Sequence, residues 1–323
     1  MNIYRSLAEA PADFGPSALT IGNFDGVHYG HRRILRRLVE LARAHGWKPS
    51  VLTFDPHPTR VVAPDRAPRL MTTVEQRTEL MREEGIEAAL ILPFTAELAK
   101  LSPEQFVRDI LVDRLGARAV LVGDNFRFGH RHAGNVAMLA ELGRQFGFET
   151  EVVSAVTCRG RIVSSSGIRG LVESGQVATA GRLLLRPYAI EGDVVSGRGV
   201  GSKQTVPTLN LATAAELIPA RGVYITCTRD LDADRRWNSI TNIGYRPTFG
   251  ASEERTIETF LLEPLTGETP RRIRVEFLRR VRDERKFDSP EALRAQILHD
   301  VGVAQRYFRR LRAWVGRVPC TSS

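Results

Sequence analysis

The chain has 323 residues, of which 42% are apolar and 26% charged, and its formal net charge is +9. This length favours two domains, and the composition is that of an ordinary globular protein. A positive charge suits a polyanion partner, but only four of the 46 basic residues are lysine and the arginines are dispersed, whereas a nucleic-acid interface gathers its basic residues on one face. We therefore expect no nucleic-acid partner.

The cysteines Cys158, Cys227 and Cys320 are odd in number and far apart, so neither a disulfide framework nor a zinc site is predicted. A reducing cytoplasm fits them. The first residues lack the apolar core of a signal peptide, and no uncharged run approaches the length of a membrane span. We expect a cytoplasmic protein without a membrane partner.

Residues 21–31 read Ile-Gly-Asn-Phe-Asp-Gly-Val-His-Tyr-Gly-His. They lie between an apolar run that predicts a strand at 18–21 and an amphipathic stretch that predicts a helix at 32–45. Glycine relieves the backbone where a strand turns tightly into a helix. Three glycines fall at every fourth position of this segment: Gly22, Gly26 and Gly30.

His28 and His31 stand where this predicted helix begins. A helix N-terminus offers unpaired N–H groups and a partial positive charge, which together make an anion site. The same dipole disfavours a charged imidazole, so we expect both rings to be neutral N–H donors until a phosphate binds. A lone histidine is more often structural, and the segment matches neither the dinucleotide fingerprint nor the Walker loop. The strand, the glycine turn and the pair together favour a phosphate site.

Strands and helices alternate through the rest of the first half. This alternation predicts an α/β, doubly wound domain with a mostly parallel sheet, whose ligands bind beyond the carboxyl ends of the strands. Ser102 and Gln105 form a predicted capping box. Strands are predicted at 49–54, 88–92, 119–123 and 149–153, and helices at 74–84, 103–115, 135–146 and, after three serines, up to about 175.

Polar segments follow several of these strands. One, at 55–58, is fixed by two prolines. Another, at 124–129, reads Asp-Asn-Phe-Arg-Phe-Gly, which is either a turn with two core phenylalanines or a site for a flat polar ligand. A third, at 164–169, places three serine hydroxyls and Arg169 at a helix start, as ordinary capping or as a second anion site. Two anion sites without a Walker loop point to nucleotidyl transfer.

Beyond residues 184–187 the pattern changes to short strands without helices between them. Such spacing predicts a small antiparallel β-barrel. One helix follows, with Ser289 as its N-cap, and runs towards Leu311. The strands are predicted at 189–195, 208–212, 223–229, 237–243, 256–262 and 273–278.

Two segments of this second half carry chemistry. The glycines at 197–201 predict a flexible loop, which either binds phosphates through its backbone N–H groups or is an ordinary mobile loop. Thr208 and Asn210 place a hydroxyl and an amide on one side of a strand, as a hard cation needs, although the spacing alone means little.

Several motifs together resemble the bifunctional riboflavin kinase/FMN adenylyltransferase family. They are the segments 21–31, 53–58, 122–129 and 164–169, with Pro-Thr-Leu-Asn at 207–210 and Asn-Ile-Gly-Tyr-Arg-Pro-Thr-Phe at 242–249. The resemblance covers nearly the whole chain. It implies an FMN adenylyltransferase domain at 1–184 and a riboflavin kinase domain at 185–323, with ATP, riboflavin, FMN and FAD as substrates or products and Mg²⁺ as the cofactor.

The resemblance also implies roles for single residues. It assigns catalysis to His28, His31 and Glu258, ATP binding to Gly22, Asn23, Phe24, Asp25, Ser164, Ser165, Ser166, Arg169, Gly197, Gly199, Gly201 and Thr208, flavin binding to Asn125 and Phe128, and the metal to Thr208 and Asn210. Strand alternation puts Glu258 on the same face as Thr256 and Phe260. If that face lines the mouth of the barrel, the carboxylate is held rigidly towards the substrate.

Two alternatives stay open. The segment 200–207 departs from the family pattern, which favours an adenylyltransferase whose barrel binds flavin with weak or no kinase activity. The other alternative is a basic nucleic-acid-binding protein that uses the barrel as a platform, which predicts arginines and aromatics on one barrel face.

Overall fold

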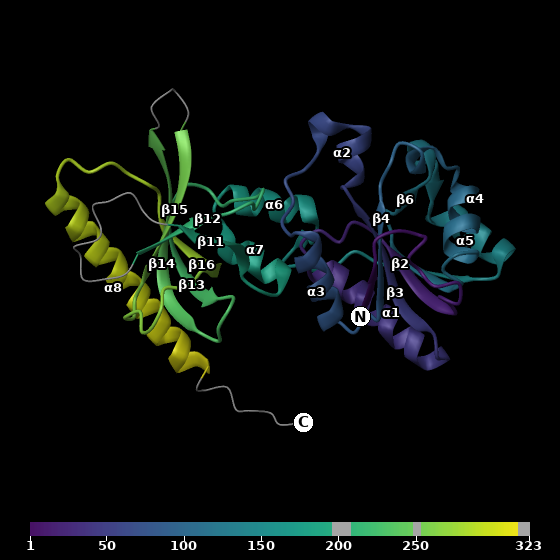
Figure 1. The fold of residues 1–323 in the computed structure, drawn as a ribbon, viewed down its shortest axis with the longest axis horizontal. Coiled ribbons are helices and arrows are strands. Elements are labelled where there is room, and N and C mark those ends of the chain that lie inside the picture. Colours follow the sequence, from purple (N-terminus) through teal and green to yellow (C-terminus); the bar gives the residue numbers. More distant parts are fainter. Residues whose placement is uncertain (196–207, 248–252, 316–323) are drawn as a thin grey trace. The chain divides into compact units, whose positions relative to one another are not determined.

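The computed structural model describes residues 1–195, 208–247 and 253–315. The chain divides into two compact units, Met1–Gly167 and Ile168–Ser323, and the division falls inside helix α6 (Ser165–Glu173). The first unit is a parallel α/β domain and the second holds an antiparallel barrel followed by a helix (Figure 1). The predicted fold class is therefore confirmed.

The first unit is built on a six-stranded sheet in which every neighbouring pair of strands is parallel. The order β1-β4-β3-β2-β5-β8 places β2 near the middle, and the chain moves to one edge through β3 and β4 and to the other through β5 and β8. The strand order thus reverses between β2 and β5, where open α/β sheets bind ligands. The strands are β1 (Asn2–Tyr4), β2 (Ser17–Ile21), β3 (Lys48–Asp55), β4 (Ala88–Pro93), β5 (Ala117–Gly123) and β8 (Glu149–Val153).

Helices cover both faces of this sheet (Figure 1). The helices α1 and α3 pack over Ala18 and Leu121, and α5 and the π-helix η3 pack over Leu19 and Val120. Because both faces are covered, the central strands are continuous apolar runs, as a parallel sheet requires. The helices are α1 (Tyr29–His45), α3 (Val74–Glu83), α4 (Pro103–Gln105), η3 (Phe106–Val112) and α5 (Val136–Phe146).

The helix predicted at 103–115 begins with the expected capping box of Ser102 and Gln105 but continues as the π-helix η3. The apolar pattern could not show this, because a few residues do not distinguish the two helical periods. Short elements escaped prediction too. They are α2 (Pro58–Val62), η1 (Pro64–Arg66), η2 (Leu98–Lys100), η4 (His130–His132) and the strand pairs β6 (Arg127–Phe128) with β7 (Gly134–Asn135) and β9 (Thr157–Cys158) with β10 (Arg161–Ile162).

The described residues of the second unit form a closed antiparallel barrel in the order β11-β12-β15-β14-β13-β16. Helix α7 (Val177–Leu184) precedes it and packs on β11 and β16. All six predicted strands are present. They are β11 (Tyr188–Val195), β12 (Thr208–Ala212), β13 (Gly222–Asp230), β14 (Arg236–Pro247), β15 (Glu253–Leu261) and β16 (Arg272–Arg282).

Hydroxyl groups fill much of the barrel interior. Thr226 bonds to Ser239 and to Thr241 (2.8 Å each), Thr228 bonds to Ser239 (2.8 Å), and Thr241 bonds to Thr259 (2.9 Å). All five side chains are fully buried. The network therefore joins inward-facing residues of β13, β14 and β15 in the observed register.

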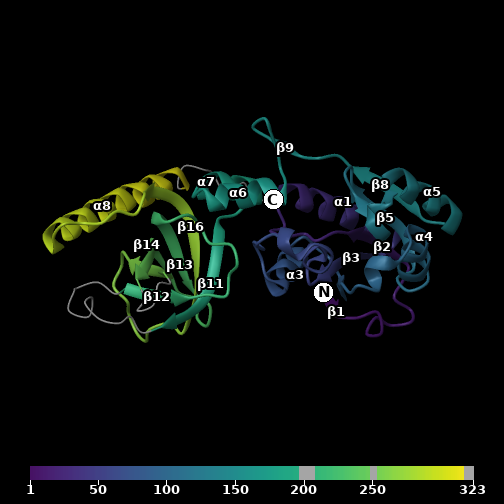
Figure 2. The ribbon, with the colours of Figure 1, turned by 90° about the horizontal axis from the view of Figure 1, so that it is seen from above.

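Helix α8 (Pro290–Val315) begins as predicted, with the hydroxyl of Ser289 accepting the backbone N–H three residues on (3.1 Å). It lies along the outside of the barrel (Figures 1 and 2). Its buried Ala304 and Phe308 belong to one apolar cluster with Val223 and Ile240. The outward face of β13 and β14 is therefore the face that α8 covers.

Candidate functional site

The loop that joins β2 to α1 has a backbone conformation that few residues adopt. Phe24 and Val27 have φ angles of 50° and 35°, and Gly26 has 79°. A left-handed backbone costs a residue with a side chain about 1–2 kcal/mol, and such conformations gather at functional sites. This loop lies beyond the carboxyl end of β2, next to the reversal of strand order, which makes it a candidate part of a ligand site.

Asp25 fixes this loop to two other segments. Its carboxylate is 1% exposed and accepts the backbone N–H groups of Met71 (2.9 Å) and Thr72 (3.2 Å) and the Thr72 hydroxyl (3.2 Å). Its carbonyl accepts the hydroxyl of Ser165 at the start of α6 (3.0 Å). Asp25 therefore bonds to protein groups through both its side chain and its main chain.

His28 and His31 are stacked, with ring centroids 3.6 Å apart and planes 15° from parallel. His28 is the N-cap of α1, and its Nδ1 accepts the backbone N–H of His31 (3.3 Å), so that a neutral His28 carries its proton on Nε2. The His31 ring meets the edge of Phe24, and its Nδ1 is buried without a hydrogen-bond partner among the described residues. An unsatisfied ring nitrogen at a helix N-terminus suits a ligand oxygen.

Burial holds the pKa of His31 well below the ordinary value of 6.5, and the electrostatic effect of the neighbouring His28 lowers it further. Because a lowered pKa favours the neutral imidazole, His31 is uncharged at neutral pH. The prediction of a neutral His31 rested on the helix dipole, whereas the largest cause found in the structure is removal of the ring from water.

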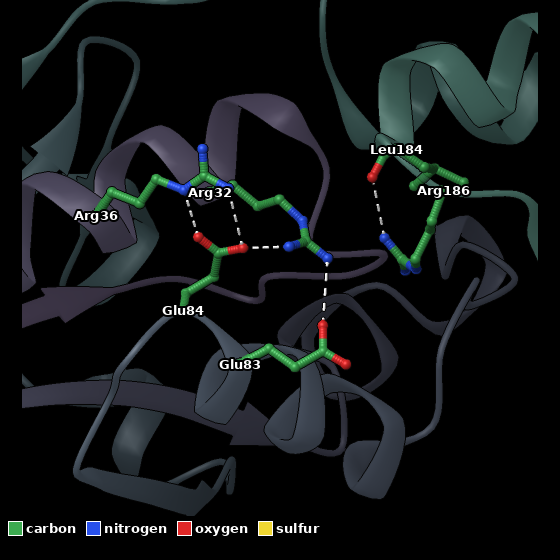
Figure 3. A network of polar contacts seen from close by, with 6 residues as sticks. All are labelled: Arg32, Arg36, Glu83, Glu84, Leu184 and Arg186. Atoms are coloured by element: carbon green, nitrogen blue, oxygen red, sulfur yellow. Dashed lines mark hydrogen bonds and ion pairs between the residues drawn. The ribbon is translucent and has the colours of Figure 1, made fainter. Parts of the chain in front are cut away.

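Ion pairs hold the first turns of α1 against the end of α3. Arg32 and Arg36 converge on Glu84, which follows α3, and Arg36 Nε lies 2.6 Å from its carboxylate (Figure 3). Arg32 also approaches Glu83 (3.7 Å). The Glu84 side chain is only 4% exposed, and a paired carboxylate at that depth constrains its partners more than a surface pair does. The stacked histidines thus begin a helix that is fixed at its first turns.

The serines before α6 contact the same loop. The Ser164 hydroxyl accepts the backbone N–H of Gly167 (3.2 Å), as an ordinary N-cap does, and Ser165 donates to Asp25. Ser166 is exposed. Arg169 follows in the first turns of the same helix, on the side of the division that belongs to the second unit.

A cavity of about 460 Å³ opens beside the loop in the first unit. Its wall is mostly aromatic and apolar, and its rim carries exposed basic side chains. The lining includes Ile21, Gly22, Asn23, Phe54, Phe94, Phe106, Phe126 and Phe128, with Lys100, Arg127, His130, Arg131 and His132.

Phe128, a predicted flavin-binding residue, is a buried part of this wall and stacks on Phe126 with ring centroids 5.5 Å apart. Gly134 leaves room for it, because a Cβ at that position would lie 2.7 Å from the Phe128 ring. Asn125, the other predicted flavin residue, is exposed and is not one of the lining residues. Of the residues predicted to bind ATP, Gly22 and Asn23 line this cavity.

Asn23 is held by groups that the sequence analysis did not connect with it. Its carbonyl accepts Nη1 of Arg77 (2.6 Å) and the hydroxyl of Thr53 (3.4 Å), and its side chain lies 3.0 Å from Nε2 of His57. Arg77 is 2% exposed; burial lowers its pKa, and the carboxylates of Asp25 and Asp55 oppose that effect. An arginine in an amphipathic helix predicts a surface position, so no local signal pointed to Arg77.

The second unit has a cavity of its own, of about 800 Å³, between the barrel and α8. Thr208, Glu258, Phe260 and Asn242 line it, together with Val223 and Ile240 of the face that α8 covers. Glu258 and Phe260 do share one face, as strand alternation predicted. Helix α8 covers that face, which therefore lies on the outside of the barrel. Strand alternation alone could not tell which face a helix would cover.

Three polar residues at or next to this cavity lie side by side on neighbouring strands. Asn210 of β12 pairs with Glu258 of β15, and Glu258 pairs on its other side with Asn242 of β14. Residues directly opposite on antiparallel strands have Cβ atoms about 4.5–5.5 Å apart. In the sequence, Asn242 was noted only as the first residue of segment 242–249, which resembles the family. The strand register is what places it opposite Glu258.

Helix α8 and the segment before it close the cavity. Asp300 of α8, 4% exposed, pairs with Arg282 of β16 (2.9 Å) and accepts from Gln296 (2.7 Å). Leu293 and Ile297 give the helix an apolar face on the cavity. The lining also includes Glu284, Arg285, Lys286, Phe287 and Asp288.

Some predicted residues lie outside the described part of the chain: Gly197, Gly199 and Gly201. Over the described ranges, no three His, Cys, Asp or Glu side chains cluster as a metal site would require. Within the same ranges, no helix is both long and apolar enough to cross a bilayer.

The first unit combines a parallel sheet with a strained loop and paired histidines at its switch point. The second unit is a barrel with a carboxylate in a cavity of its own. Together these features are typical of two-unit transferases that use nucleotides. Comparison with known proteins narrows that class. A family model described as FAD synthetase matches residues 10–167, and one described as riboflavin kinase matches residues 184–308. The chain belongs to the bifunctional riboflavin kinase/FMN adenylyltransferase family.

Relatives cover the chain almost from end to end. The bifunctional riboflavin kinase/FMN adenylyltransferase of Pseudomonas fluorescens is 35% identical over 94% of this chain and 97% of its own. That of Escherichia coli (strain K12) is 33% identical over 94% and 96%. A solved structure, described as a macrolide-efflux protein from Streptococcus pneumoniae, superposes with a TM-score of 0.83 at 25% identity and covers 94% of this chain and 98% of its own.

Proposed function

We propose that this chain makes FAD from riboflavin in two ATP-dependent steps, phosphorylation in the barrel unit and adenylyl transfer in the α/β unit. The observation that carries the proposal is the pair of separate cavities, one beside the stacked histidines and one lined by Glu258, in a chain that matches both family models. Its partners in this proposal are small molecules, and its compartment is the cytoplasm.

In adenylyl transfer, a phosphate oxygen of FMN attacks the α-phosphorus of ATP, and the bond from that phosphorus to the departing pyrophosphate breaks. Negative charge develops on the phosphate oxygens, and fixed N–H donors aimed at them are the main catalytic resource. His28 and His31 supply such donors at the N-terminus of α1. Gly22, Phe24 and Asp25 shape the loop that receives ATP.

The serine-rich start of α6 supplies a second set of contacts in this proposal. Ser164, Ser165, Ser166 and Arg169 bind the far phosphates of ATP. Hydroxyls and a guanidinium at a helix start are suited to anions. The hydrogen bond from Ser165 to Asp25 supports the proposal, because it joins this helix start to the loop that carries the histidines.

The aromatic cavity of the first unit suits the flavin ring. Phe128 and its stacked partner Phe126 offer flat apolar surface, which pairs well with another aromatic system. Asn125 is exposed three residues before Phe128, and we assign it to a polar edge of the bound flavin.

In the kinase step, the terminal hydroxyl of riboflavin's ribityl chain attacks the γ-phosphorus of ATP, ADP leaves, and Glu258 accepts the hydroxyl proton. A hydroxyl is a poor nucleophile at neutral pH, so a positioned carboxylate assists it. The lining of the second cavity and the cross-strand neighbours of Glu258 support this role. Thr208 binds ATP in the same cavity, and we assign Gly197, Gly199 and Gly201 to its phosphates.

Magnesium is the cofactor that we propose for the kinase. Thr208 and Asn210 offer a hydroxyl and an amide oxygen, and Asn210 lies opposite Glu258 in the barrel. Mg²⁺ takes oxygen ligands and usually binds through a few protein groups together with substrate phosphates. This neutral pair fits such a shared site, in which bound Mg²⁺ would offset charge on the phosphates of ATP.

We place the functional boundary between residues 184 and 185. The matched riboflavin kinase segment begins at residue 184, and helix α7 ends there. The buried side chains of α7 face the barrel strands β11 and β16, so a fragment without this helix exposes apolar surface while keeping the whole kinase cavity.

A time course tests the proposal. Purified protein is incubated with riboflavin, ATP and magnesium, and riboflavin, FMN and FAD are separated at intervals. FMN should appear first and FAD after it. If FAD forms from supplied FMN but riboflavin is not phosphorylated, the barrel binds flavin without acting as a kinase, and this is the outcome that the departures in segment 200–207 would favour.

A further inference from the structure

Asn23 stands at the meeting point of the strained loop and the aromatic cavity. It lies five residues before His28 in the chain, and it lines the cavity with Phe54 and Phe126. Its carbonyl is already bonded to Arg77 and Thr53. The side-chain amide is therefore the part of Asn23 that can act on a ligand.

The hydrogen bonds of His57 determine how that amide is turned. The Nδ1 atom of His57 accepts the backbone N–H of Thr59 (3.3 Å), so a neutral imidazole must carry its proton on Nε2. The group that faces Nε2 at 3.0 Å is the Asn23 amide, and a donor there needs an acceptor opposite. In the structure the amide atom at this distance is Nδ2, which is a second donor. Because the oxygen and nitrogen of an amide are nearly indistinguishable in shape, the hydrogen bonds of His57 favour the reverse orientation, with Oδ1 facing His57.

With its oxygen on His57, the amide turns its NH₂ group away from that ring, in the wall of the cavity. Other lining residues, such as Ile21 and Phe54, are apolar or aromatic. An NH₂ group there offers two donors and no acceptor. It suits a ligand oxygen, and a phosphate oxygen best, because hydrogen bonds to charged groups are the stronger ones.

The chemistry of the step decides which end of FMN lies here. The flat ring suits the phenylalanines, whereas the phosphate must reach the α-phosphorus of ATP beside His28 and His31. Asn23 is in the loop that leads to those histidines. A phosphate turned towards the cationic rim at Lys100 and Arg127 would lie against other segments, η2 and β6, and not against this loop.

We propose that the Asn23 amide donates to the 5′-phosphate of FMN and orients the oxygen that attacks ATP, and that His57 and Arg77 are positioning residues which hold Asn23 in place. This role replaces the ATP contact that the family resemblance implied for Asn23. The inference rests on the proposed adenylyl transfer. The attacking oxygen is already deprotonated, so Asn23 transfers no proton: one P–O bond forms at the α-phosphorus and one breaks, and pyrophosphate leaves with its electron pair.

Asn23→Asp is the test, with Asn135→Asp as the matched control. An aspartate at position 23 still accepts from His57, but it offers no donor and sets a charge against the phosphate. Asn135 is the N-cap of α5, where an aspartate caps equally well. We expect Asn23→Asp to raise the KM for FMN about 10- to 100-fold, the scale for losing a hydrogen bond to a charged group. The KM for ATP should stay within about twofold, and the control should match the wild type.

His57→Ala should raise the KM for FMN by a smaller factor, and the double variant Asn23→Asp/His57→Ala should be no worse than Asn23→Asp alone, because His57 acts through Asn23. Three results would overturn the inference: an unchanged KM for FMN in Asn23→Asp, an equal rise in the KM for ATP, or additive losses in the double variant. A larger effect of Lys100→Ala on the KM for FMN would instead place the phosphate at the rim. If the wild type made no FAD from FMN and ATP, the proposed function itself would fail.

Discussion

Acid should destabilise the first unit through His31. In the folded protein the pKa of His31 is held well below 6.5, mainly by burial, whereas in the unfolded chain the group returns to its ordinary value. Below about pH 6.5 the unfolded chain therefore binds a proton that the folded chain does not, and stability falls as the pH falls. His31→Gln removes the titrating group and keeps a polar side chain.

The size of the effect follows from one proton. Its limiting slope is about 1.4 kcal/mol of unfolding free energy per pH unit. Between pH 6.5 and 5.5 the loss integrates to about 1 kcal/mol, because the unfolded group is only half protonated at the upper limit. For a unit of the size of Met1–Gly167, that corresponds to a fall in Tm of about 2–4 °C.

Calorimetry of the full chain at about pH 7.5, 6.5 and 5.5 measures this loss. The matched control is His45→Gln, at the other end of α1, where the ring is exposed and stacks on Trp47. The fall in Tm with acid should be smaller in His31→Gln by the amount given above and unchanged in His45→Gln. If His31→Gln keeps the full acid slope of the wild type, His31 is not held neutral by the fold, and the reasoning from its burial fails.

Three further outcomes are expected. His28→Ala should lower FAD formation from FMN about 100-fold or more, the scale for losing one fixed donor to a developing charge, while riboflavin phosphorylation is unchanged; FAD formation within a few-fold of the wild type would remove His28 from the mechanism. Glu258→Gln should lower FMN formation from riboflavin about 10²- to 10⁴-fold and leave FAD formation from supplied FMN near normal, whereas parallel loss of both activities would mean a structural role. A fragment that starts at Leu185 should phosphorylate riboflavin and make no FAD, and a companion that starts at Ile168 and keeps α7 serves as its control; a folded companion without kinase activity would contradict the assignment of the kinase to the barrel.

Local patterns predicted the helices and strands well, because the spacing of apolar residues that distinguishes them extends over only a few neighbouring positions. The apolar run at 18–21 and the capping box at Ser102 gave a strand and a helix start at the expected places. The loop at 21–31 was predicted in the same way, from glycines and histidines at a strand-to-helix turn. Predictions of this kind need no knowledge of the rest of the chain.

What the sequence could not reveal depends on contacts between distant segments. Arg77 and His57 meet Asn23 across 54 and 34 residues, and neither has a local signal that separates it from a surface side chain. The face of Glu258 is a similar case. Strand alternation grouped it with Phe260, but only the packing of α8 decides that this face lies outside the barrel.

Because α8 closes the cavity of the barrel, this cavity is completed late in protein synthesis. The cavity of the first unit uses residues up to His132, whereas the cavity of the barrel needs Leu293, Ile297 and Val301. At about 5–20 residues per second, a ribosome makes the stretch from Gly167 to Val301 in roughly 7–27 seconds, and domains generally fold in the order in which they emerge. A nascent chain should thus bind FMN before it has the means to produce it, and a chain released early should act only on FMN that complete molecules have made.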